Sequence, residues 1–128
     1  MKQDERKIRV LCVDDYPDSA DSLAWALQLS GYECRCAHGG EEALLVANSF
    51  FPDVCFTDIN MPGMDGFQLA RELRQRFHSI CIIAITARVA QPLSLSSGSS
   101  PFDLEIKKPA CVDVLGNLLA GLPMSEKV

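Results

Sequence analysis

The segment from Val54 to Gly66 reads VCFTDINMPGMDG, and it decides how the rest of the chain is interpreted. It begins with a short apolar run that is typical of a strand, and this run ends in a single carboxylate, Asp58. Pro62 and Gly63 then indicate a turn. The pattern predicts a buried strand that delivers one acid to the rim of a sheet. There the acid could ligate a cation, act as a base or a nucleophile, or cap the next helix.

Strands and helices alternate on both sides of this segment. Residues 9–13 form a near-continuous apolar run without alternation, which is typical of a parallel strand covered on both faces. In 17–30 apolar residues recur at helical spacing, with Pro17 near the start and Gly31 just after the end. Further strands are predicted at 32–37, 80–85 and 104–107, and further helices at 41–48, 66–77 and 111–119. In the helix at 66–77 we expect Arg71, Glu72, Arg74 and Arg76 to face water.

The segment 88–102 breaks the alternation. Two prolines, a glycine and five serines leave few good helix formers there. We expect a loop or a degenerate fourth helix. Alternating strands and helices predict an α/β fold with a doubly wound, five-stranded parallel sheet, since right-handed crossovers place helices on both faces. Five such units suit the flavodoxin-like strand order 2-1-3-4-5.

Length and composition predict one domain over residues 1–128, with flexible ends at 1–7 and 121–128. The 128 residues are 48% apolar and 23% charged, which is typical of a soluble globular chain. We find neither a membrane-spanning run nor a secretory signal and expect a cytoplasmic protein. The net charge of -5 argues against direct binding of nucleic acid, which requires a basic surface.

The six cysteines are expected to be reduced, because several lie inside apolar runs where cysteine behaves as a small hydrophobic residue. Cys34 and Cys36 are expected to project to opposite sides of their strand, so we predict neither a zinc site nor a disulfide there. No catalytic role is expected for His38 or His78. Trp25 is expected to belong partly to the core.

Ligands of such sheets bind beyond the carboxyl ends of the strands, and this rim should gather scattered polar residues. They are Asp14, Asp15, Asp58, Thr86 and Lys108. Three close carboxylates favour a bound cation, and Mg²⁺ accepts carboxylates together with a backbone carbonyl such as that of Asn60. The hydroxyl of Thr86 and the ammonium of Lys108 suit phosphoryl oxygens, with Asp58 as the in-line nucleophile.

Alone, Asp14 or Asp15 would more often cap a helix. Lys107 is an alternative to Lys108, since the two would point in opposite directions.

Four motifs together resemble the response-regulator receiver domains of two-component signalling, which have a chemotaxis-regulator-like fold. They are Val13-Asp14-Asp15, the run from Asp58 to Gly66, Ile85-Thr86-Ala87 and Lys108-Pro109. The resemblance implies that Asp58 takes a phosphoryl group from a phosphohistidine on a sensor histidine kinase or a histidine phosphotransfer protein. It also implies that Asp14, Asp15, Asp58 and the Asn60 backbone hold Mg²⁺, and that Thr86 and Lys108 contact the phosphate. Such a domain is a switch and not a turnover enzyme.

The chain departs from the family pattern at Glu105, where receivers usually carry tyrosine or phenylalanine, and in the segment 88–102. A charged side chain is costly to bury in the slot of an aromatic ring, so the readout of phosphorylation is expected to differ. The alternative function is a pseudo-receiver that docks a protein partner without phosphorylation. A haloacid-dehalogenase-like phosphohydrolase would need an Asp-x-Asp motif on its first strand, which Asp14-Asp15 does not match.

Overall fold

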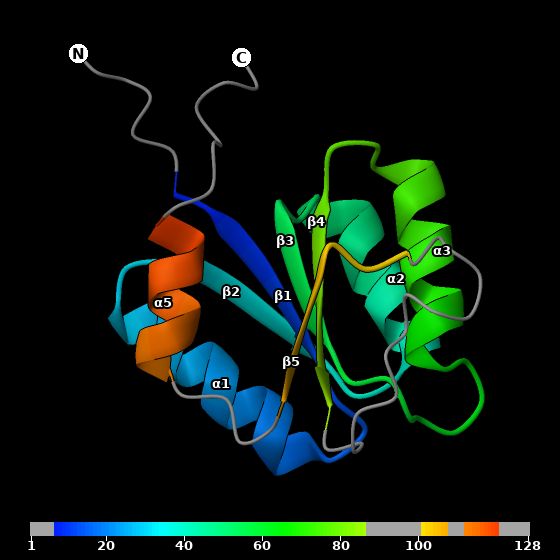
Figure 1. Cartoon of the computed structure of the whole chain (residues 1–128), viewed down its shortest axis with the longest axis horizontal. Coiled ribbons are helices and arrows are strands. Elements are labelled where there is room, and N and C mark those ends of the chain that lie inside the picture. Colours follow the sequence, from blue (N-terminus) through cyan, green and yellow to red (C-terminus); the bar gives the residue numbers. More distant parts are fainter. Residues whose placement is uncertain (1–6, 87–100, 108–111, 121–128) are drawn as a thin grey trace.

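The computed structural model of the chain describes residues 7–86, 101–107 and 112–120 (Figure 1). Its strands are β1 (Arg9–Val13), β2 (Glu33–Ala37), β3 (Val54–Thr57), β4 (Cys81–Thr86) and β5 (Leu104–Lys107). Its helices are α1 (Pro17–Leu29), α2 (Gly40–Phe50), α3 (Gly66–Arg76) and α5 (Val112–Ala120). Each agrees with its predicted range to within about two residues at either end, which is the usual uncertainty of helix and strand boundaries.

The five strands form one parallel sheet in the order β2-β1-β3-β4-β5, so the predicted fold class is confirmed. The predicted loop or degenerate helix at 88–102 falls almost entirely on residues 87–100, outside the described residues. The predicted flexible ends likewise lie outside them, apart from Lys7. Within the described ranges, no helix is both long and apolar enough to cross a membrane.

Two apolar clusters fill the space between the sheet and its helices. Helices α2 and α3 cover one face, and α1 and α5 cover the other (Figure 1). Strand β1 shows how the sequence serves both faces: Leu11 and Val13 pack towards α2 and α3, whereas Val10 and Cys12 pack towards α1 and α5. This explains the unbroken apolar run in the sequence, because each side chain of a covered parallel strand is buried.

Two predictions about single side chains are wrong. Trp25 is 64% exposed, because its neighbour Ala24 occupies the inward position on α1. Cys34 and Cys36 both pack against the cluster beneath α1 and α5, since residues two apart in a strand share a face. The cysteines at the described positions are free, as expected.

Arg74 departs from the expectation that the charged residues of α3 face water. Its guanidinium donates to the carbonyl oxygen of Ile80 (2.6 Å), to that of Pro101 (2.7 Å) and to Asp103 Oδ2 (2.9 Å). Asp103 Oδ2 also accepts from the backbone N–H of Ile82 (2.8 Å). Arg74 therefore connects α3 to the start of β4 and to the segment that enters β5.

Candidate functional site

Backbone hydrogen bonds place two acids at the carboxyl ends of neighbouring strands. Asp58 follows β3, and its N–H donates to the carbonyl oxygen of Val13 (3.0 Å). Asp14 follows β1, and its N–H donates to the carbonyl oxygen of Ala37 (3.2 Å). These bonds continue the ladders of the sheet by one residue. Both acids are thus held at the carboxyl ends of their strands, as the sequence predicts.

The structure brings the carboxylates of Asp14, Asp15 and Asp58 together, with one oxygen from each within 4.8 Å of the others. Asp14 is buried, Asp58 is half-buried and Asp15 is exposed. The Oδ1 of Asp14 accepts from the N–H of Tyr16 (3.0 Å), and the Oδ1 of Asp58 accepts from the N–H of Ile59 (2.7 Å). Three converging negative charges favour a cation among them. A set made only of oxygen donors fits the hard ion Mg²⁺.

The sequence did not identify Thr57 as a site residue, although its side chain contacts Asp58. Its side chain is buried, and its hydroxyl donates to the carbonyl oxygen of Asp58 (2.8 Å). This bond restrains the backbone of Asp58 just where the chain leaves β3. In the sequence, Thr57 differs from its neighbours only as a single hydroxyl side chain within the otherwise apolar run from Val54.

The loop after Asp58 is anchored on both sides of its turn. Ile59 and Met61 are buried, and Gly63 adopts a φ of 77°, a conformation that favours glycine. Asp65 then begins α3 with a capping box: its Oδ1 accepts from the N–H of Gln68 (2.9 Å), and its own N–H donates to Gln68 Oε1 (3.2 Å). The loop is therefore fixed by packing, by a glycine turn and by a helix cap.

Gly66 lets α3 approach the backbone of Asp58. Its N–H donates to the carbonyl oxygen of Ile59 (2.8 Å). A Cβ at this position would clash with the carbonyl oxygen of Asp58 and would lie 2.8 Å from the Cα of Ile59. Both contacts are with backbone atoms, so a side chain here requires the loop itself to move.

Gly66→Ala is expected to lower the free energy of unfolding by about 1–3 kcal/mol, the usual cost of inserting a methyl group where there is no space. Gly116→Ala in α5 is the control. A Cβ there meets nothing within 4 Å, and alanine in a helix is better than glycine by roughly 0.5–1 kcal/mol. Urea unfolding of both variants measures the difference. Equal stability of the two variants would contradict the tight approach at Gly66.

The remaining predicted site residues are only partly described. Thr86 is the last residue of β4 and pairs with Lys107 of β5. Since Thr57 pairs with Ala84, Thr86 reaches the same rim as Asp58. The side chain of Thr86 and the whole of Lys108 lie outside the described residues.

Two further predicted positions are exposed. Asn60 lies two residues after Asp58, at the rim and on the surface of the loop. Glu105 lies in β5, pairs with Ala84 and is also exposed. The carboxylate of Glu105 therefore does not occupy a buried slot.

Comparison with known proteins assigns residues 10–118 to the family described as response regulator receiver domain. The sensor histidine kinase RcsC of Salmonella typhimurium is 34% identical over 111 residues, which is 87% of this chain and 12% of the relative. The sensor protein EvgS of Escherichia coli is 38% identical over 117 residues, 91% of this chain and 10% of the relative. This chain thus spans about a tenth of the length of these relatives.

Among solved structures, the response regulator protein TrrA of Thermotoga maritima superposes with a TM-score of 0.76 and is 35% identical. The match covers 88% of this chain and 96% of that one. That structure was solved in complex with Mg(2+)-BeF. The likeness therefore includes both the sequence and the arrangement of strands and helices.

Proposed function

The chain belongs to the response regulator receiver domain family of two-component systems, and from this premise we propose that Asp58 accepts a phosphoryl group from a phosphohistidine. The observation that supports this proposal best is the convergence of Asp14, Asp15 and Asp58 at the end of β1 and β3. In the step, an Asp58 carboxylate oxygen forms a bond to phosphorus while the bond from phosphorus to the donor nitrogen breaks. The imidazole keeps that electron pair, and Asp58 becomes an acyl phosphate.

We further propose that Asp14, Asp15 and Asp58, with the backbone carbonyl of Asn60, hold Mg²⁺. When bound, the ion would neutralise negative charge on the phosphoryl oxygens. The buried Asp14 is oriented by its hydrogen bond from Tyr16, so its charge needs little rearrangement to receive the ion. Thr86 and Lys108 are proposed to contact the phosphoryl oxygens.

The proposed partner is a sensor histidine kinase or a histidine phosphotransfer protein. The relatives RcsC and EvgS, named as sensor proteins, support this class. The chain would act as a switch that is modified and then released, not as an enzyme that turns over a separate substrate.

The test is phosphorylation by a small donor. The wild-type chain incubated with acetyl phosphate and Mg²⁺ is expected to gain the mass of one phosphoryl group in intact-protein mass spectrometry. The modification should be removed by hydroxylamine, which cleaves acyl phosphates, and should not form when EDTA has removed the metal. If the folded chain takes up no phosphoryl group from acetyl phosphate in the presence of Mg²⁺, that result would favour the alternative function. The alternative is a module that docks a protein partner without phosphorylation.

A further inference from the structure

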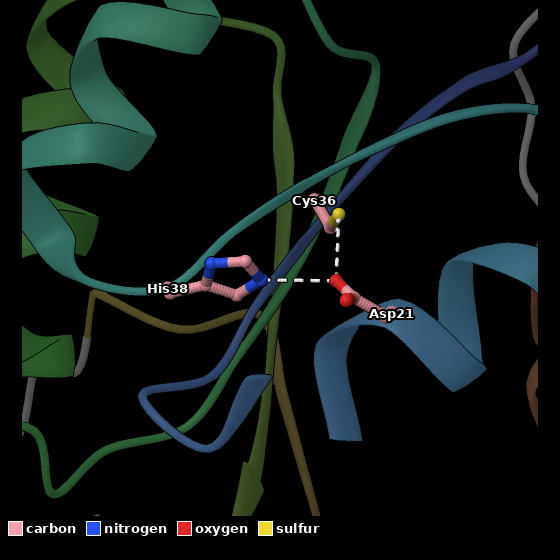
Figure 2. Close-up of side chains that lie close together, drawn as sticks. All are labelled: Asp21, Cys36 and His38. Carbon is pink, nitrogen blue, oxygen red and sulfur yellow. Dashed lines mark hydrogen bonds and ion pairs between the residues drawn. The ribbon is translucent and has the colours of Figure 1, made fainter. Parts of the chain in front are cut away.

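A second group of side chains of the types that bind metals lies beside α1. It is separate from the three rim acids Asp14, Asp15 and Asp58. Asp21 comes from α1, Cys36 from β2 and His38 from the connection that follows β2 (Figure 2). Asp21 Oδ1 lies 2.9 Å from His38 Nε2 and 3.0 Å from Cys36 Sγ. The aspartate oxygen thus stands between a ring nitrogen and a sulfur, as Figure 2 shows.

The donor atoms of these three side chains lie close to one another. One donor atom from each residue lies within 4.8 Å of the others. Nitrogen, sulfur and oxygen ligands bind Zn²⁺ at about 2.0–2.3 Å, so tetrahedral donors lie roughly 3.4 Å apart. The distances from Asp21 Oδ1 to His38 Nε2 and to Cys36 Sγ are about half an ångström shorter than this. Small movements of the exposed Asp21 and of the half-buried His38 would therefore open the group around an ion.

The surroundings of the group are also suited to a metal. The side chains of Asp21 and His38 are 55% and 35% exposed, so an ion in solution can reach them. Glu42 Oε1 accepts from the N–H of His38 (3.0 Å) and lies 3.9 Å from its Nδ1. Imidazole that ligates through Nε2 carries its proton on Nδ1. At 3.9 Å the contact between Glu42 Oε1 and Nδ1 is too long for a hydrogen bond, so Glu42 would have to move by about 1 Å to accept from Nδ1, as the outer partner of a metal-bound histidine usually does.

We propose that Asp21, Cys36 and His38 form a Zn²⁺ site, with water as the fourth ligand. The mixed set of a thiolate, an imidazole and a carboxylate suits Zn²⁺ and not Mg²⁺. Binding replaces the thiol proton of Cys36, which is released to solvent, and uses the lone pair of His38 Nε2. The ion joins α1 to the end of β2.

Contacts within the group shift the pKa values of Asp21 and Cys36. Hydrogen bonds from His38 and Cys36 lower the pKa of Asp21, so its carboxylate is already ionised. Burial, and then the hydrogen bond to Asp21, raises the pKa of the Cys36 thiol to about 11. Release of that thiol proton is therefore part of the cost of binding the ion.

The experiment uses Co²⁺ as a spectroscopic probe and Zn²⁺ as its competitor, both in excess Mg²⁺. The wild-type chain is expected to bind one Co²⁺ with a sulfur-to-metal charge-transfer band, which Zn²⁺ abolishes by displacement. Cys36→Ser should remove the band. His38→Gln should weaken Zn²⁺ affinity by more than about 100-fold, because losing only an outer partner costs roughly 10–100-fold.

The controls separate this site from other thiols, from the other histidine and from the rim acids. Cys81→Ser, His78→Gln and Asp58→Asn should each leave the band and the Zn²⁺ affinity unchanged. If Cys36→Ser loses its native circular dichroism spectrum, Asp21→Asn takes its place and should weaken binding while the fold is kept. Absence of binding in the wild type, or binding that Asp58→Asn abolishes and His38→Gln does not, would overturn the proposal.

Discussion

Asp58→Asn is expected to abolish phosphorylation of the chain by acetyl phosphate. Asparagine has nearly the same shape, and its side-chain oxygen can still accept the hydrogen bond from the N–H of Ile59. It lacks the nucleophilic carboxylate oxygen, so the acyl phosphate cannot form. Mass spectrometry of the variant with donor and Mg²⁺ should show only the unmodified chain.

Asp18→Asn is the matched control for this experiment. Asp18 is an exposed acid in the first turn of α1, so its replacement changes the net charge equally and leaves the three rim acids intact. This control should be modified at the wild-type rate. Persistent phosphorylation of Asp58→Asn, at a level equal to that of Asp18→Asn, would place the acceptor elsewhere in the chain.

Asp14→Asn is expected to lower the rate of phosphorylation by roughly 10²–10³-fold. This is the usual loss when one fixed electrostatic contact to a transition state is removed. The amide can keep the hydrogen bond from the N–H of Tyr16, so the loop after β1 should retain its shape. The expected loss of phosphorylation rate therefore measures the effect of removing the negative charge of Asp14.

The measurement is the initial rate of modification as a function of Mg²⁺ concentration. Asp14→Asn should require much more Mg²⁺ than the wild type, whereas Asp18→Asn should follow the wild-type curve. A variant with wild-type dependence on Mg²⁺ would exclude Asp14 from the proposed metal site, while leaving Asp58 as the acceptor.

The fold could be predicted because its signals are local and repeated. Apolar runs such as Val10 to Val13 mark strands that are covered on both faces, and right-handed crossovers restrict their order. The same reasoning gathers Asp14, Asp15 and Asp58 at one rim, which the structure confirms as a spatial cluster. Magnesium binding, phosphorylation and the cytoplasmic location stay predictions.

What could not be predicted depends on contacts between distant segments. Arg74 has the spacing of a water-facing residue, and its partners at Pro101 and Asp103 follow a segment without a regular pattern. Asp21 is separated by 15 residues from Cys36, and only the packing of α1 beside β2 brings them together. Gly66 stands in a recognisable motif, yet the reason for a glycine there is the backbone of Asp58.

The exposed charge of Glu105 is expected to oppose association between copies of this chain in concentrated solution. Strand β5 is an outer strand of the sheet, and Glu105 and Lys107 are both exposed on it. Outer strands with flat apolar surfaces recruit strands of other molecules and so promote aggregation, which charged side chains oppose. An aromatic ring at position 105 would restore the usual family residue. It would also remove a charge that protects the β5 edge.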